Sequence, residues 1–171
     1  MTKFIGAFLV VFACTTWGYM HNFKERNTIS AIRELSMLFS EIARSISFRL
    51  EPLTQVIHRL ASEKRSAAAL FLHQLDDGLS IGDMPFDALW QKAASFFAKE
   101  THLPDQAAEI LQSVGMHLGK MDYEAEVNRL TEAAKELKTL EEEMKKNNLK
   151  TEKTVKSLGV LLGLFIVIIL L

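Results

Sequence analysis

Cysteine, proline and glycine are all scarce in this sequence. The 171 residues include one cysteine, three prolines and eight glycines. A single cysteine, Cys14, allows neither a disulfide within the chain nor a metal site built from several thiolates. Long stretches without proline or glycine, together with abundant Ala, Leu, Glu and Lys, favour helices. We therefore expect an all-α fold, and the length is sufficient for one domain with a modest core.

The chain also lacks an excess of charge of either sign. Lys and Arg together number 20 and Asp and Glu 21, which gives a formal net charge of -1 at pH 7. Proteins that bind nucleic acids usually carry a clear basic excess. The sequence therefore gives no indication of a nucleic-acid partner.

Catalytic motifs and metal-ligand spacings are missing as well. No HExxH or HxxxH pair, GxSxG elbow or Walker lysine motif occurs. The run Asp76-Asp77-Gly78 has the carboxylates of a calcium loop but neither its alternation nor its terminal glutamate. Two carboxylates brought together by the fold could still act as an acid–base pair, which sequence alone does not reveal. We predict a protein that is not an enzyme and has no metal or cofactor.

Both ends of the chain are apolar. Residues 4–20 contain no charge, and seventeen residues are near the lower limit for a helix that crosses the hydrocarbon. Residues 158–171 are wholly apolar but would form only about 21 Å of helix, which leaves open whether this tail spans completely. Basic residues flank the inner side of both runs, and the positive-inside rule then places the middle of the chain in the cytoplasm.

The predicted organisation follows from these ends. We expect an N-terminal transmembrane helix over residues 1–20, a cytosolic helical bundle over 21–157 and a C-terminal transmembrane tail over 158–171. The protein would be a two-pass protein of the cell membrane. Gly159 and Gly163 form a GxxxG motif, which lets membrane helices pack closely and makes a homo-oligomer possible.

A different reading of the N-terminus remains open. Lys3 with a short apolar stretch is also typical of a secretory signal, and Val11-Phe12-Ala13-Cys14 faintly resembles a lipoprotein cleavage box. The alternative function is then an exported helical binding domain with a lipid or membrane anchor. Phe12 is bulky where a small residue is usual, and the apolar run continues past Cys14.

The middle of the chain reads as about six successive helices joined by short turns. Apolar residues of the first helix recur at intervals of three and four, and this stripe runs from Ile29 to Leu50. The helix is expected to stop before Pro52, which suits the first turn of the next one. A third helix should end at Asp76-Asp77-Gly78, and Asp83 should cap the fourth. The residues expected to be buried in the fourth helix are Phe86, Leu89, Trp90, Ala93, Phe96 and Phe97.

The stretch SVGMHLGKMD, residues 113–122, marks the corner before the last helix. A phosphate-binding loop would follow a strand, whereas this one follows a helix. We expect Gly115 to lie where a neighbouring helix approaches, Gly119 to adopt a left-handed conformation and Asp122 to cap the final helix. That helix should run to about residue 149, and its continuation into the tail is left open.

Arginines concentrate in the first two predicted helices. Such a charged face can contact an acidic partner or anionic lipid headgroups. The candidate partner-binding residues are Arg33, Arg44 and Arg49.

Several stretches together resemble the stage III sporulation protein AB family. They run from end to end of the chain: Lys3 to Gly6, Thr15 to Tyr19, Phe48 to Leu53, the G-x-x-L-G-x-x-D spacing of Gly115, Leu118, Gly119 and Asp122, and Lys156 to Gly163. One departure is Ser45, which stands where the family tends to carry a glutamate before the Ile-x-aromatic stretch. The chain therefore lacks that glutamate at this position, and its nearest preceding glutamate, Glu41, lies one turn earlier.

The resemblance implies a function that composition and periodicity do not. The family belongs to a secretion-like channel complex between mother cell and forespore, needed for endospore formation. Its cytosolic bundle is similar to the F-type inner-membrane platform proteins of type II secretion. The implied partners are a cytosolic secretion-type ATPase, similar to stage III sporulation protein AA, and other membrane proteins of the complex. The implied location is the mother-cell side of the outer forespore membrane.

Overall fold

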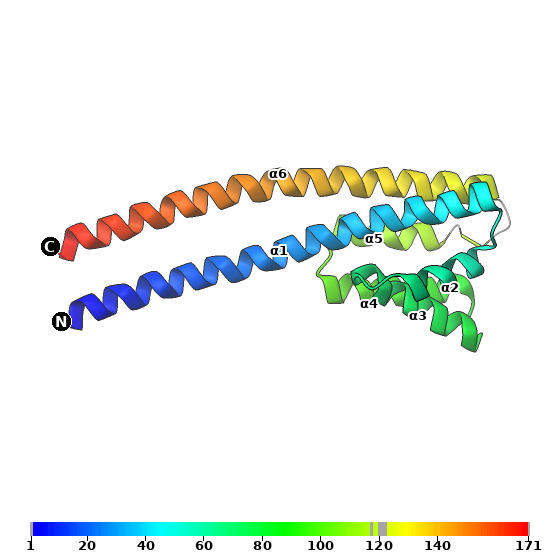
Figure 1. Cartoon of the computed structure of the whole chain (residues 1–171), viewed down its shortest axis with the longest axis horizontal. Coiled ribbons are helices and arrows are strands. Elements are labelled where there is room, and N and C mark those ends of the chain that lie inside the picture. Colours follow the sequence, from blue (N-terminus) through cyan, green and yellow to red (C-terminus); the bar gives the residue numbers. More distant parts are fainter. Residues whose placement is uncertain (1, 117, 120–122, 171) are drawn as a thin grey trace. The chain divides into compact units, whose positions relative to one another are not determined.

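The computed structural model describes the backbone of residues 2–116, 118–119 and 123–170, and the side chains of 25–116, 118–119 and 123–149. Within these ranges the chain forms α-helices and no strand (Figure 1). The helices are α1 (Thr2–Arg49), α2 (Leu53–Glu63), α3 (Ala67–Ile81), α4 (Phe86–Thr101), α5 (Asp105–Gly115) and α6 (Tyr123–Leu170). The predicted all-α fold is confirmed.

Two compact units divide the chain. The first comprises Met1–Asn27 with Glu143–Leu171, and the second Thr28–Glu142. In the first unit, the Nδ2 of Asn148 on α6 donates a hydrogen bond of 2.8 Å to the Oε2 of Glu25 on α1. No helix within the described part of the chain is long and apolar enough to cross a membrane. The runs predicted to span it, 1–20 and 158–171 with Gly159 and Gly163, lie outside the described side chains.

The second unit is a bundle built around Trp90. The indole of this α4 residue is fully buried and lies edge-on to Phe71 of α3, with ring centroids 5.0 Å apart. Phe86 and Phe39 lie farther out, at 5.8 and 6.3 Å. The indole Nε1 donates a hydrogen bond of 2.8 Å to the carbonyl oxygen of Leu111 on α5. Each aromatic residue buries a large apolar area, so this cluster joins α1, α3, α4 and α5 in one core.

The helix α1 contributes the most regular side of this core. Its residues at intervals of three and four are buried, namely Ile32, Leu35, Phe39, Ile42 and Ile46. Burial on one side of a helix leaves the opposite stripe open to solvent. Two hydrogen bonds add to the apolar packing: Ser36 Oγ donates to the carbonyl oxygen of Ala134 on α6, and Thr28 Oγ1 donates to that of Thr101 on α4.

Two predicted helix boundaries are wrong. The helix α3 continues through Gly78 and ends before Gly82, whose φ of 69° is left-handed. At Gly78 a Cβ would overlap the side chain of Leu89, so this glycine allows a close contact between α3 and α4 instead of ending the helix. The helix α4 begins at Phe86 with Pro85 at its N-cap, and Asp83 lies outside it. A proline fits this position because its fixed φ suits a helix start.

A basic groove as the candidate functional site

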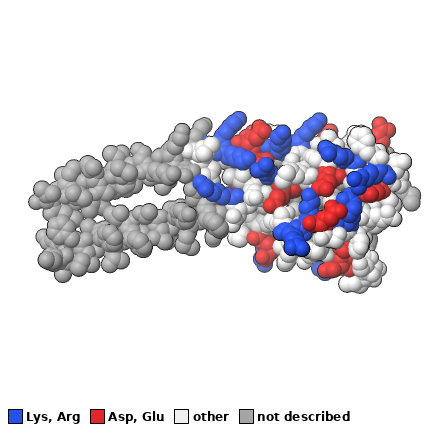
Figure 2. All heavy atoms as spheres, in the orientation of Figure 1, with Lys and Arg blue, Asp and Glu red and all other residues white. Residues whose placement is uncertain are grey.

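The exposed stripe of α1 lines a groove on the second unit. The groove has a volume of about 740 Å³, and its walls come from α1, from Arg59 of α2, and from Lys138 and Glu141 of α6. Basic residues outnumber acidic ones among its lining residues: Arg33, Arg44, Arg49, Arg59 and Lys138 against Glu41 and Glu141. On the face that Figure 2 presents, basic and acidic side chains are interspersed. The lining of the groove, in contrast, has a basic excess.

All three arginines that the sequence singled out line this groove. Arg33 and Arg44 stand three helical turns apart on the same side of α1, and both are exposed. Neither has a hydrogen bond or ion pair with any residue in the described part of the chain. Arg49 differs, because its Nη1 lies 3.7 Å from Oε1 of Glu51. The groove thus contains two guanidinium groups that have no partner among the described residues and a third that is weakly paired.

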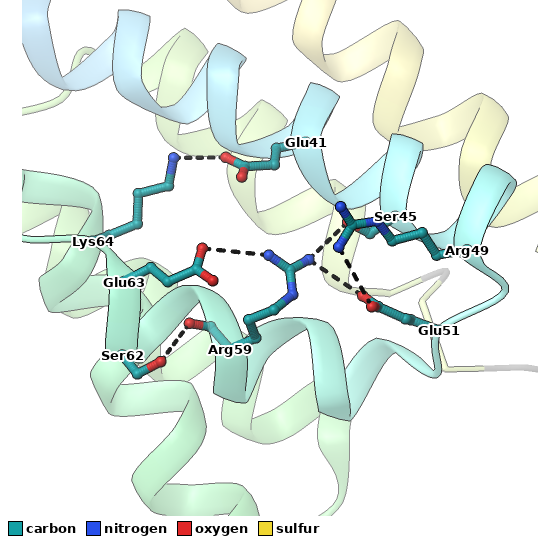
Figure 3. A network of polar contacts seen from close by, with 8 residues as sticks. All are labelled: Glu41, Ser45, Arg49, Glu51, Arg59, Ser62, Glu63 and Lys64. Atoms are coloured by element: carbon teal, nitrogen blue, oxygen red, sulfur yellow. Dashed lines mark hydrogen bonds and ion pairs between the residues drawn. The ribbon is translucent and has the colours of Figure 1, made fainter.

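Arg59 holds the end of α1 against α2 (Figure 3). Its Nη2 donates hydrogen bonds to Ser45 Oγ at 2.9 Å and to Glu51 Oε2 at 3.2 Å, and its Nη1 donates to Glu63 Oε2 at 3.4 Å. The guanidinium is only partly exposed. Because two carboxylates lie next to it, the charge of Arg59 is largely balanced within the protein. Its role is therefore structural, and it adds little net positive charge to the groove.

Glu41 is engaged in the same region (Figure 3). Its Oε2 accepts a hydrogen bond of 2.6 Å from Lys64 Nζ, which links α1 to the segment after α2. At the position where the family tends to carry a glutamate, Ser45 is buried and accepts its bond from Arg59. The charge that Glu41 brings is therefore largely balanced by Lys64 before any partner arrives.

The groove also contains hydroxyl groups that are already paired. Ser36 Oγ donates to the carbonyl oxygen of Ala134 at 2.8 Å, and Ser40 Oγ donates to the carbonyl oxygen of Ser36 at 2.9 Å. With Ser45 bound to Arg59, the three serines of the lining each have an internal partner. Removing water from these groups costs less than removing it from unpaired polar groups.

Two apolar side chains of the groove are strongly exposed. Met37 is 50% exposed and Phe48 is 82% exposed. Sequence reasoning did not select either residue, although their positions opposite the buried stripe of α1 predict that both face outward. Lys138 was also missed, and no sequence signal places this α6 residue beside α1.

The remaining predicted residues lie away from the groove. Pro52 occupies the N-cap of α2, and its carbonyl oxygen accepts hydrogen bonds from the first turn. Gly115 ends α5, and a Cβ there would overlap the indole of Trp90. Gly119 has a φ of 78°, in the left-handed region. Asp122 lies outside the described residues.

Metal-ligating side chains do not gather in the part of the chain that the structure describes. No group of three His, Cys, Asp or Glu residues there is placed to hold a metal ion. His58 Nδ1 lies 2.9 Å from Asp76 Oδ1, a two-residue contact between α2 and α3.

The described residues thus form an all-α bundle that carries a basic, partly apolar groove. The family model of stage III sporulation protein AB matches residues 3–171, so the chain belongs to that family. It is similar to the stage III sporulation protein AB of Bacillus subtilis (strain 168), with 23% identity over 171 residues, which is 100% of both chains. No solved structure gives a significant match. The resemblance inferred from short motifs is confirmed.

Proposed function

We propose that the chain is a non-enzymatic platform component of a secretion-like channel complex between mother cell and forespore. In this role it docks the cytosolic ATPase of the complex, a protein similar to stage III sporulation protein AA. Membership of a stage III sporulation protein family supports a role in endospore formation. The observation that carries the docking role is the groove, where Arg33 and Arg44 have no partner within the described residues.

The proposed location is the mother-cell side of the outer forespore membrane. The apolar runs 1–20 and 158–171 would cross the membrane and leave residues 21–157 in the cytoplasm, as the basic flanks suggest. Anchoring both ends would keep the bundle at the membrane with a fixed orientation. The charged groove would then face the soluble ATPase at a high effective concentration. Copies of the chain can also associate through Gly159 and Gly163.

Charge reversal tests the docking role in sporulating cells. The full-length variant carries Arg33→Glu, Arg44→Glu and Arg49→Glu, and the ATPase is measured by copurification alongside counts of heat-resistant spores. A matched control reverses Arg65, Lys92 and Lys99, three exposed basic residues that do not line the groove. We expect the groove variant to lose the ATPase and to form few spores, while the control retains both at equal protein abundance. Retention of the ATPase by the groove variant would remove the groove from the docking role.

Cysteine labelling tests the location. In a Cys14→Ser background, the exposed Asp77 is replaced with cysteine and treated with a membrane-impermeant maleimide. We expect labelling only after the cells are lysed. Labelling in intact cells would instead support an exported domain with a lipid or membrane anchor.

A further inference from the structure

The groove has the length of a helix-binding site. Its α1 wall extends from Arg33 to Arg49, which corresponds to about 24 Å, or a little over four turns of helix. Side chains of α2 and α6 form the other walls, so the groove is bounded by helices. Amphipathic helices bind proteins by laying their apolar side into such a groove.

The unpaired charges of the groove favour an acidic occupant. Like Arg33 and Arg44, Lys138 has no hydrogen bond or ion pair within the described part of the chain, and all three are exposed. Glu41 is paired with Lys64, and Glu141 is buried. The sequence from 28 to 142 contains 18 acidic and 12 basic residues, a formal net charge of -6. The groove is thus locally basic on an acidic bundle, and an acidic segment is directed to it and repelled elsewhere.

The exposed apolar side chains of the groove favour an occupant that has an apolar side as well as acidic residues. Met37 and Phe48 are eleven residues apart, three turns along the same side of α1, and both are largely open to solvent. The three serines that line the same groove, Ser36, Ser40 and Ser45, have hydroxyl groups with internal partners. A partner can therefore cover this part of the groove without leaving these groups unpaired.

We propose that the groove binds an acidic amphipathic helix of a protein partner, about four turns long. Carboxylates along the edges of that helix pair with Arg33, Arg44 and Lys138, and its apolar side covers Met37 and Phe48. The inference rests on the proposed function, because it takes the groove as the docking surface of the platform. A lipid surface suits the groove less well, because an extended anionic surface would also face the acidic bundle around the groove, whereas a single helix lies within the groove.

The probe is a synthetic acidic peptide. It has sixteen residues, with leucines at intervals of three and four on one side and glutamates on both edges, and it carries a fluorophore. A scrambled peptide of the same composition is the control. The full-length chain is held in phosphatidylcholine nanodiscs, and empty nanodiscs give the background. Fluorescence anisotropy then measures the dissociation constant.

We expect the amphipathic peptide to bind and the scrambled peptide to bind at least tenfold more weakly. Phe48→Ala should weaken binding by about tenfold, the effect of losing an aromatic anchor. Ile81→Ala, which removes a 72% exposed side chain away from the groove, should have no effect. Arg33→Glu with Arg44→Glu should abolish binding, whereas Arg65→Glu with Lys92→Glu should not. Raising the salt concentration from 50 to 300 mM should weaken binding, because exposed charge pairs are screened.

Two other occupants would overturn the inference. If added vesicles of anionic phosphatidylglycerol displace the peptide, and Arg33→Glu with Arg44→Glu abolishes direct binding of the protein to those vesicles, the groove binds lipid headgroups. If the peptide does not bind, and Phe48→Ala converts an oligomer into monomers in sedimentation, the groove binds a second copy. Equal binding of both peptides, or unchanged affinity in Phe48→Ala, also refutes the amphipathic helix. Phe48 is exposed, so its replacement should preserve the helical circular dichroism that checks folding.

The outcomes separate this inference from the proposed function. Groove-dependent peptide binding, together with unchanged copurification of the ATPase in the triple charge-reversal variant, would support the helix-binding groove and remove the ATPase as its partner. Loss of the ATPase in that variant, together with no effect of Phe48→Ala on the peptide, would support docking and refute the amphipathic helix.

Discussion

Replacing Gly115 with alanine sets helix propensity against core packing. Gly115 is the last residue of α5 and is buried. A Cβ at this position would overlap Cδ1 and Cγ of Trp90 and lie 2.7 Å from the indole Nε1. The indole cannot yield easily, because it is fully buried, packed against Phe71 and bonded to the carbonyl of Leu111.

The two effects have opposite signs. Alanine is favoured over glycine inside a helix by about 1 kcal/mol, and by less at its last residue. Forcing a methyl group into a packed core typically costs about 1–3 kcal/mol. Moving the indole would also weaken its hydrogen bond to Leu111, with a further cost of about 1 kcal/mol. We therefore expect Gly115→Ala to lower the free energy of unfolding by about 1–3 kcal/mol.

Trp90 itself provides the assay. The chain has two tryptophans, so a Trp17→Phe background leaves Trp90 as the reporter of urea unfolding. Gln106→Ala, at an exposed position of α5, is the matched control and should change stability by less than about 0.5 kcal/mol. Equal or greater stability of Gly115→Ala would show that the contact with Trp90 does not constrain this position.

A double-mutant cycle isolates the contact. Trp90→Phe removes the larger ring and makes room for the added methyl group. Adding Gly115→Ala to Trp90→Phe should then cost at least about 1 kcal/mol less than adding it to the parent, as measured by circular dichroism. Strict additivity would contradict the proposed clash.

Three further substitutions test the turns and caps. Gly119→Val should lower the melting temperature, because a φ of 78° costs a non-glycine residue about 1–2 kcal/mol. The effect should come from the backbone alone, since the nearest side chain, Phe86, would lie 3.5 Å from the added Cβ. An unchanged melting temperature would refute this. Leu50→Gly should stabilise the protein by up to about 1 kcal/mol in urea unfolding, because Leu50 is exposed and has a φ of 53°. Glu34→Ala should cost about 1 kcal/mol, because Oε2 of Glu34 accepts the backbone N–H of Ala68 at the start of α3, and a neutral result would exclude this capping role.

Periodicity along the sequence predicted most of the core but not the helix ends. The stripe of α1 is buried as predicted at Ile32 and Ile42. Leu50, predicted as its last member, is 76% exposed because the chain leaves the helix there. Phe96 of α4 was expected to be buried and is 37% exposed. Spacing gives the average direction of a side chain, whereas burial depends on which neighbouring helices extend far enough to cover it.

The candidate site was only partly predictable for the same reason. Arg33 and Arg44 lie on one side of a single helix, so their spacing alone indicates a shared face. Lys138 joins them only through the register between α1 and α6, to which the bond from Ser36 to Ala134 contributes. Whether a basic side chain can contact a partner also depends on whether it already has an internal hydrogen bond or ion pair. The hydrogen bond from Arg59 to Ser45, for example, forms only because α2 packs against α1.

The contact between Gly115 and Trp90 has a consequence for how the family varies. These residues lie 25 positions apart in the sequence, and a side chain at one occupies space needed by the other. A larger residue at position 115 alone would clash with the indole, and a smaller residue at position 90 alone would leave a cavity. The two positions should therefore change together during evolution. Relatives with a residue larger than glycine at the position of Gly115 should carry a smaller side chain at that of Trp90. The two positions are thus expected to covary among members of the family.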